Sequence, residues 1–384
     1  MTHCNTILSQ VLTVIPKYEF EALTKKYRSN KWTQKFTNWN QFVYLLYGQL
    51  KQKDSLRDIQ VGLEAQGNKL YHLGVQTVKR STVSDACNKR DYRVYQELFH
   101  VLLKRFKQLT ARQLNIPNPI VSLDATIIKL CYSLFPWTKM PKKKGGLKLH
   151  FALSHTHLIP EFVHITKGTT NDIEGAKQLS LIPDSILVFD KGYHSYAWFN
   201  HIHKHSVTFV TRLKDNACYQ SIGQHPIPDP HSSILSDEDI VFTKRKKKDY
   251  PRPLRLVTYE DPDSKKIFKF ITNNETFKAE TIALIYKQRW LIELFFKWIK
   301  QHLKIKTFLG TSKNAVFSQI WIALCLFLIL KYIKYQTHYK YSLLHLSRVL
   351  REVAFERASL LDILSLKKTR SLLFSTGQLD FGFT

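Results

Sequence analysis

Acidic residues are scarce in this chain. Its 384 residues include 58 lysines and arginines but only 30 aspartates and glutamates, so the formal net charge is +28. Such a surplus predicts a polyanionic partner, and nucleic acid fits best because basic side chains displace counterions from phosphates. Binding of a basic surface to an anionic membrane is the alternative, but it needs an anchor that the sequence does not offer.

Paired cysteines and long apolar runs are also lacking. The five cysteines are scattered and none stands in a Cys-x-x-Cys pair, so neither a zinc site nor a disulfide framework is predicted. The most apolar run, residues 320–330, is too short for a bilayer, and the N-terminal residues lack the pattern of a signal peptide. We therefore expect a cytoplasmic, nucleoid-associated protein that does not enter a membrane.

Two changes of pattern divide the chain. Residues 1–115 have apolar side chains at helical spacing, which predicts an all-helical N-terminal domain that binds DNA. We expect an α/β core in two parts, 116–213 and 276–310, with a β-rich insertion at 214–275 and a helical region at 311–384. Two short helices in the first domain, near residues 55 and 81, form either a helix-turn-helix reader or part of a small bundle.

The core segment contains five apolar runs rich in β-branched residues. They predict strands at PIVSLDATIIKLCYSL, LKLHFALSHT, PEFVHIT, DSILVFDKGY and HSVTFVTRL, with helices before and after the fourth. The order of three strands, helix, strand, helix, strand suits a ribonuclease-H-like mixed sheet with flanking helices. The fold class expected is thus α/β, interrupted by the insertion and preceded by the helical domain.

Two aspartates stand near the ends of predicted strands. Asp124 lies in SLDAT and Asp190 in FDKGY, where a charge is costly without a partner. Each alone could be an ordinary turn or cap residue. If the two strands are neighbours, however, both carboxylates emerge at one edge and offer the oxygen ligands that Mg²⁺ prefers.

A third carboxylate lies in a basic helical segment, YKQRWLIELFFKWIK. Offsets of 3, 4 and 7 residues place Tyr286, Arg289, Glu293 and Lys300 on one side of a single predicted helix. Glu293 could hold a metal ion while Arg289 and Lys300 bind phosphate oxygens. The alternative is a solvated basic face with ordinary ion pairs between successive turns.

These residues resemble the DDE transposases of the insertion-sequence-4 family. Tyr286, Arg289, Glu293 and Lys300 match that family's Tyr, Arg, Glu, Lys motif without a break, and the segments around Asp124 and Asp190 are similar to its two aspartate motifs. The resemblance also implies a β-rich insertion between the second aspartate and the glutamate. The N-terminal region matches only in its helical character.

The resemblance implies cut-and-paste transposition at the terminal inverted repeats of a mobile element. Asp124, Asp190 and Glu293 would be catalytic and would bind two Mg²⁺ ions, with Mn²⁺ as a substitute. Arg289, Lys300 and Tyr286 would contact DNA phosphates. The steps implied are end nicking, hairpin formation and strand transfer on double-stranded DNA, carried out by a homodimer that bridges two ends.

Further DNA contacts are expected from basic and aromatic side chains. The candidates are Lys142, Lys143, Lys144, Lys191, Trp290 and Lys297. A second lysine block, residues 244–248, is either a phosphate-binding loop or solvated surface. Trp290, Phe270 and Tyr193 are the candidates for stacking against a flipped base.

Two other functions remain open from the sequence. One is a catalytically idle DNA-binding descendant of a transposase, because binding alone would explain the charge. The other is a nuclease of the same fold that does not transfer strands.

Overall fold

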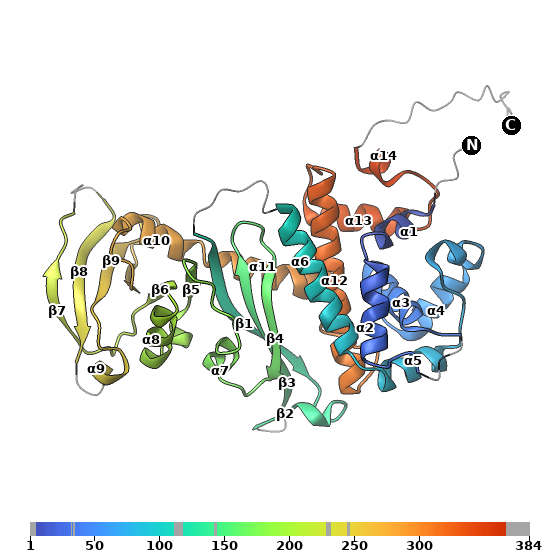
Figure 1. Cartoon of the computed structure of the whole chain (residues 1–384), viewed down its shortest axis with the longest axis horizontal. Coiled ribbons are helices and arrows are strands. Elements are labelled where there is room, and N and C mark those ends of the chain that lie inside the picture. Colours follow the sequence, from blue (N-terminus) through green and yellow to red (C-terminus); the bar gives the residue numbers. More distant parts are fainter. Residues whose placement is uncertain are drawn as a thin grey trace, which may run out of the picture. The chain divides into compact units, whose positions relative to one another are not determined.

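The structure, a computed structural model, describes residues 5–31, 33, 35–110, 118–141, 144–227, 232–243 and 246–365 (Figure 1). The chain forms two compact units: residues 1–108 with 307–384, and residues 109–306. The N-terminal and C-terminal helical regions, expected as separate parts, therefore belong to one unit. Lys142 and Lys143 lie outside the described residues, as do residues 244 and 245 of the second lysine block.

The first unit is helical, as predicted for both of its chain segments. Its helices are α1 (Ile7–Leu12), α2 (Lys17–Lys26), α3 (Asn38–Leu50), α4 (Leu56–Glu64), η1 (Gly67–Leu73), α5 (Arg80–Lys89), α6 (Arg93–Thr110), α12 (Lys313–Gln336), α13 (Leu343–Val353) and α14 (Leu360–Ser365). Backbone pairing joins the two segments, because Thr6 forms a bridge with Arg357 and the amide of Leu8 donates to the carbonyl of Ala354 over 2.8 Å. Residues so far apart in the sequence carry no local pattern from which this pairing could be predicted.

Helix α12 forms the core of this unit. It packs against α3, α5 and α13, and it begins where the Ser312 hydroxyl accepts a hydrogen bond from the amide of Ala315. At 24 residues it is longer than its apolar run and long enough to cross a membrane, but 89% of its most apolar window is buried inside the protein. Such burial is typical of a core helix.

The two short helices near residues 55 and 81 are α4 and α5. Ser55 caps α4, whereas α5 begins at Arg80 without a side-chain cap, so Ser81 lies inside the helix. Between them stand η1 and an extended stretch, a longer connection than the three- to four-residue turn of a helix-turn-helix. The spacing therefore favours the bundle alternative.

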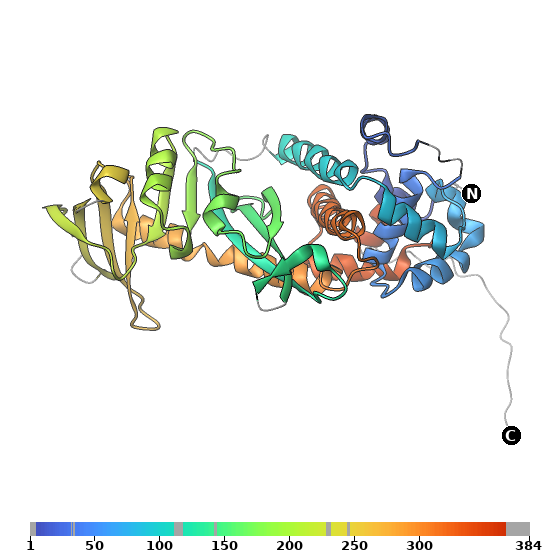
Figure 2. The same cartoon turned by 90° about the horizontal axis from the view of Figure 1, so that it is seen from below.

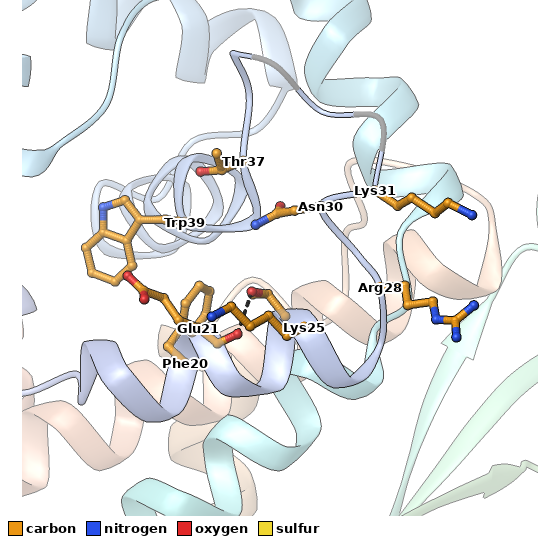
Figure 3. A pocket seen from close by; sticks show the side chains of 9 residues that line it. Phe20, Glu21, Lys25, Arg28, Asn30, Lys31, Thr37 and Trp39 are labelled. Carbon is orange, nitrogen blue, oxygen red and sulfur yellow. Dashed lines mark hydrogen bonds between the residues drawn. The ribbon is translucent and has the colours of Figure 1, made fainter.

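The first unit also has a surface pocket between α2 and the start of α3 (Figure 3). Its volume is about 450 Å³. The Trp39 ring lies edge-on to Phe20, and its indole N–H donates to the carbonyl of Leu73 over 2.8 Å, so the ring is held in place. Lys25 and Arg28 are exposed at the rim.

The second unit is built on one large mixed sheet. Its described strands are β1 (Ile120–Leu130), β2 (Lys139–Met140), β3 (Lys144–Ser154), β4 (Pro160–Lys167), β5 (Ile186–Phe189), β6 (Thr208–Arg212), β7 (Tyr219–Gln224), β8 (Ile234–Phe242), β9 (Leu254–Glu260) and β10 (Ile267–Thr272). The order is β2-β3-β1-β5-β6-β10-β9-β8-β7, and β4 pairs with β3. Strands β1, β3 and β4 are antiparallel, whereas β5 runs parallel to β1 and β6 parallel to β5. All five predicted strands of the core are present.

The insertion is β-rich, as predicted, but it is not a separate body. Strand β10 pairs antiparallel with β6, with Phe270 opposite Arg212, and β9, β8 and β7 continue the same sheet outward. The free edge of β6 explains this, because an unpaired strand edge leaves backbone donors and acceptors that a neighbouring strand can satisfy. Short helix α9 (Lys246–Asp249) follows β8.

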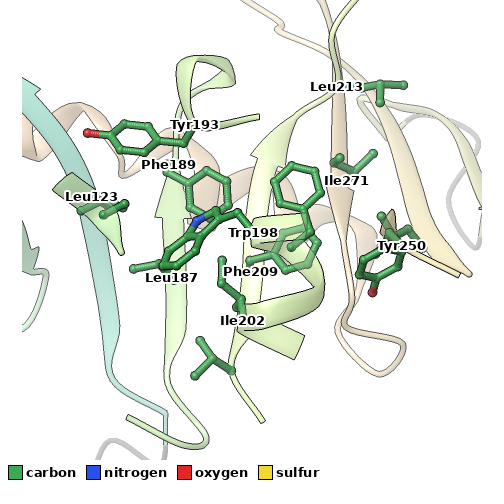
Figure 4. Close-up of a cluster of buried hydrophobic side chains, with 14 of the residues drawn as sticks. Leu123, Leu187, Phe189, Tyr193, Trp198, Ile202, Phe209, Leu213, Tyr250 and Ile271 are labelled. Atoms are coloured by element: carbon green, nitrogen blue, oxygen red, sulfur yellow. The ribbon is translucent and has the colours of Figure 1, made fainter. Parts of the chain in front are cut away.

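Helices cover both faces of the sheet (Figure 2). Helices α7 (Asp172–Ala176) and α8 (Tyr196–Lys204) lie on one face, and α10 (Ala279–Lys287) and α11 (Trp290–His302) on the other. The first face buries a cluster that includes Leu123, Phe189 and Tyr193 (Figure 4). On the second face, Val188 of β5 is buried in a cluster with Ile282 of α10. Because side chains alternate along each strand, every second side chain points to the face that α10 and α11 cover.

Candidate active site

Asp124 and Asp190 lie at corresponding places on neighbouring strands. In the parallel pair β1 and β5, Leu123 stands opposite Phe189, and each aspartate is the next residue. Leu123 and Phe189 point into the cluster under α8. Because successive side chains of a strand alternate, both aspartates belong to the opposite face, which α10 and α11 cover. The structure therefore brings the two predicted carboxylates together.

Asp124 is largely withdrawn from water. Its side chain is 22% exposed, and one carboxylate oxygen accepts a 2.7 Å hydrogen bond from the amide of Ala125. Burial raises the pKa of Asp124 to about 6, and the charges of Asp190 and Glu293 act in the same direction, against the lowering by Arg289. A carboxyl with a raised pKa beside two further carboxylates indicates a place that a cation would stabilise.

Asp190 is fixed by the turn that follows β5. Its carboxylate accepts a 2.8 Å hydrogen bond from the amide of Gly192 and so caps the short helix η4 (Lys191–Tyr193). A Cβ atom at position 192 would lie 2.9 Å from Asp190 Oδ1. Glycine leaves room there for the Asp190 carboxylate, which explains why position 192 of the DKGY segment is a glycine.

The segment that carries the motif is two helices rather than the single predicted helix. Tyr286 lies in α10, Glu293 and Lys300 lie in α11, and Arg289 is the residue just before α11. At the junction the amides bond to carbonyls three residues back, as in Arg289 to Tyr286. The prediction of one helix was wrong because α10 packs on β6, β9 and β10 while α11 packs on β1, and the chain must turn between them.

Arg289 joins two of the carboxylates. Its Nη2 lies 2.5 Å from Glu293 Oε1, and its Nη1 lies 3.6 Å from Asp124 Oδ2. The Arg289 side chain is 17% exposed, whereas that of Glu293 is 56% exposed. Arg289 thus connects the helix that carries Glu293 with the strand that carries Asp124.

Tyr286 and Lys300 flank this arrangement. The Tyr286 ring packs against Phe270 at 4.7 Å between centroids, the Arg289 guanidinium lies 5.8 Å from its centre, and burial raises the pKa of the phenol. Burial lowers the pKa of Lys300, to which the charge of Lys306 contributes, while attraction to Asp124 opposes it. Lys300 is therefore close enough to Asp124 for an electrostatic interaction with its carboxylate.

The donor set suits a hard divalent cation in its chemistry. Three carboxylates supply oxygen ligands, which Mg²⁺ and Mn²⁺ accept. In the described part of the chain, however, no three His, Cys, Asp or Glu side chains stand together as a group that could hold a metal ion. The guanidinium of Arg289 lies between Asp124 and Glu293 instead.

The aromatic candidates differ in access. Phe270 is 3% and Tyr193 1% exposed, so both are core residues, and their burial removes them from the candidates for stacking on a base. Trp290 is 49% exposed and directly follows Arg289. The sequence does not separate them, because burial depends on which strand and helix face each ring occupies.

The described lysine candidates are exposed. Lys144 begins β3, Lys191 follows Asp190, and Lys297 lies on the outer side of α11. Lys191 has an acidic neighbour, with its Nζ 3.7 Å from a carboxylate oxygen of Asp215.

Two polar contacts of the second unit, one of them beside the site, were missed in the sequence. His155 Nδ1 donates to Gln288 Oε1 at 3.2 Å, and its Nε2 shares a 2.5 Å hydrogen bond with the Ser122 hydroxyl, so His155 ties β1 to the junction before Arg289. Lys148 pairs with Asp172 at 2.9 Å, in the first turn of α7, which is capped by the side chain of Asn171. The only available signal was Ser122 at two residues before Asp124, on the same strand face.

Comparison with known proteins identifies the class. A family model described as a transposase DDE domain matches residues 116–329. A second model, described as a domain of unknown function (DUF4372), matches residues 3–76. Since the first match covers more than half of the chain, the protein belongs to the DDE transposase family, whose members cleave DNA strands and transfer them.

Curated relatives narrow the class further. The chain is 29% identical to a "Probable transposase for insertion sequence element IS5377" of Geobacillus stearothermophilus over 69% of this chain and 70% of the relative. It is 31% identical to a "Putative transposase y4zB" of Sinorhizobium fredii over 65% and 70%. A solved piggyBac transposase synaptic complex with hairpin DNA is similar at 14% identity, with a TM-score of 0.44 over 95% of this chain and 80% of that one. The protein is a DNA transposase of an insertion sequence.

Proposed function

We propose that Asp124, Asp190 and Glu293 are the metal-binding carboxylates of this transposase, with two Mg²⁺ ions as the resident metal and Mn²⁺ as a substitute. The observation that carries the proposal is the parallel register of β1 and β5, which sets both aspartates at one place on the face under α11. Glu293 is linked to Asp124 through Arg289. The strand order supports a ribonuclease-H-like core.

The chain's own residues supply the phosphate contacts. Bound divalent ions supply an activated water and charge neutralisation for phosphoryl transfer. Arg289 and Lys300 bind phosphate oxygens beside the scissile bond, since a guanidinium makes two parallel hydrogen bonds to such a group. The Tyr286 hydroxyl adds a contact on the same side.

The reaction proposed is cut-and-paste transposition of the insertion-sequence-4 kind. Water attacks the phosphorus at the end of the element, and the 3′-oxygen leaves. The freed 3′-hydroxyl attacks a phosphorus of the opposite strand to close a hairpin, and the 3′-oxygen of the flanking DNA leaves. Water reopens the hairpin and releases the 3′-hydroxyl, which then attacks a phosphorus of the target DNA, whose 3′-oxygen leaves. A homodimer bridges the two ends, and the enzyme works on the nucleoid in the cytoplasm.

Two surfaces are proposed to bind the DNA beyond the reacting phosphate. Around the site, Trp290 stacks on an unpaired base, and Lys144, Lys191 and Lys297 contact the backbone. In the helical unit, the basic rim of the pocket beside α2 supports its predicted role in DNA binding (Figure 3).

The test is cleavage by the Glu293→Gln variant. The substrate is duplex DNA with the inverted repeats that flank the gene, incubated with Mg²⁺. We expect cleavage to be abolished while DNA binding persists, because the amide keeps the shape and loses the charge that holds metal. Glu174→Gln is the matched control: Glu174 is 58% exposed, close to the 56% of Glu293, and should leave cleavage unchanged.

The same assay separates the alternative functions. Nicking by the wild-type protein excludes an idle DNA-binding descendant. Joined products, scored with a target plasmid, exclude a nuclease that does not transfer strands. Undiminished cleavage by the Glu293→Gln variant would refute the site.

A further inference from the structure

The guanidinium of Arg289 lies between two of the three proposed metal-binding carboxylates, Asp124 and Glu293. It contacts Glu293 at 2.5 Å and Asp124 at 3.6 Å, and both contacts bury it to 17% exposure. In this arrangement the described residues offer no group of three side chains able to hold a metal. The carboxylate oxygens are therefore suitable ligands for a divalent ion, but Arg289 lies between two of them in this arrangement.

Arg289 is bound here with part of its hydrogen-bonding capacity unused. Its Nε atom is buried and has no hydrogen-bond partner in the described structure. Of the two carboxylate contacts, only the one to Glu293 has hydrogen-bond distance. A buried donor without a partner costs free energy, so this position is not the best one available to the side chain.

The position of Arg289 allows it to move. It stands at the junction between α10 and α11, where the amides of Arg289, Leu291 and Ile292 bond to carbonyls three residues back rather than four. A long side chain at such a place can turn from the carboxylates towards solvent without disturbing either helix. A DNA phosphate there would satisfy the planar fork of donors better than the single close contact with Glu293 does.

Charge makes the two arrangements exclusive. Three neighbouring carboxylates repel one another unless a cation lies among them, and in the free protein Arg289 is that cation. A divalent ion and a guanidinium cannot both lie between Asp124 and Glu293, because each repels the other. Arrival of one must therefore release the other.

We propose that Arg289 is a placeholder for the metal, bridging Asp124 and Glu293 in the free protein and moving onto a DNA phosphate when the ion enters. This inference rests on the proposed assignment of the three carboxylates as metal ligands. It makes metal binding and DNA binding cooperative. The metal ion releases Arg289 for the DNA phosphate, and the DNA phosphate draws Arg289 away from the carboxylates that bind the metal. Free protein then binds metal weakly and gains a complete site only on DNA.

The experiment measures Mn²⁺ binding to the full chain by electron paramagnetic resonance, without DNA and with a short duplex. For the Arg289→Gln variant we expect at least tenfold tighter Mn²⁺ binding than wild type without DNA. The duplex, corrected for Mn²⁺ bound to DNA alone, should tighten wild-type binding at least tenfold and the variant's less than threefold. Equal or weaker Mn²⁺ binding by Arg289→Gln would overturn the proposal.

Three further variants guard the interpretation. Arg289→Lys keeps the charge and should remain within threefold of wild type, which separates loss of charge from altered packing. Lys287→Gln removes an exposed charge two residues away and should also stay within threefold. If neither Asp124→Asn nor Glu293→Gln weakens Mn²⁺ binding, the proposed metal site itself fails; if they do and Arg289→Gln does not tighten it, only the placeholder fails.

Discussion

Replacing Asp124 with asparagine should stabilise the metal-free protein at neutral pH. Burial raises the pKa of this carboxyl from its ordinary value of 3.8 to about 6. A difference of about two pKa units corresponds to about 3 kcal/mol between the two protonation states. Because the folded state disfavours the charged form, ionised Asp124 lowers the free energy of unfolding, and the neutral amide of similar shape does not.

The sign of the pH dependence follows from proton binding. Well below the ordinary pKa of 3.8 the carboxyl is protonated in both states and costs nothing. As pH rises from about 4 to 6, the unfolded chain releases a proton that the folded chain retains, so stability falls, and above pH 6 the full penalty is present. The advantage of Asp124→Asn should therefore be small at pH 4 and complete at pH 7.5.

The assay is thermal unfolding of both proteins in a chelator at pH 4 and pH 7.5. For a unit of this size, about 3 kcal/mol corresponds to a rise of roughly 6–12 °C in the midpoint at pH 7.5. Asp215→Asn is the control, because that carboxylate is 94% exposed and should change the midpoint little at either pH. A lower midpoint for Asp124→Asn at pH 7.5, or an equal difference at both pH values, would refute the argument from burial.

Two other predictions follow from charges elsewhere in the second unit. Asp237 and Arg255 form a buried pair at 2.6 Å, with side chains 4% and 7% exposed; Asp237→Ala should lower the free energy of unfolding in urea by about 3–5 kcal/mol, and a loss below 1 kcal/mol would contradict it. Lys297→Gln should weaken duplex DNA binding and reduce the slope of log affinity against log salt by about 0.9, and an unchanged slope would show that Lys297 makes no phosphate contact.

The strands of the core could be predicted because their signal is local. Runs of β-branched residues around Leu123, Val188 and Val210 favour buried strands wherever they lie. The two strand-end aspartates could be paired in advance only on the condition that their strands are neighbours. That condition is met by β1 and β5, but no feature of either segment alone specifies it.

What could not be predicted depends on contacts distant in sequence. The turn at Arg289 separates two helices because each packs on a different part of the sheet, while the local spacing favours one continuous helix. The burial of Phe270 and Tyr193, and the link from His155 to Gln288, likewise depend on strand pairing. The Arg289 contact with Asp124 joins residues far apart in the chain, so spacing indicated only its partner Glu293.

Because β6 pairs with β10, the insertion begins and ends on neighbouring strands of the sheet. The polypeptide leaves the core after Arg212 and returns at Phe270, which stands directly opposite in the ladder. The two ends of the insertion are therefore neighbours, while β8 and β9 pack on α10 and Phe242 and Leu254 belong to the core cluster under α8. Changes in length are thus best accommodated in the loops that join the outer strands of the insertion, because changes in β8 or β9 would alter the packing of α10.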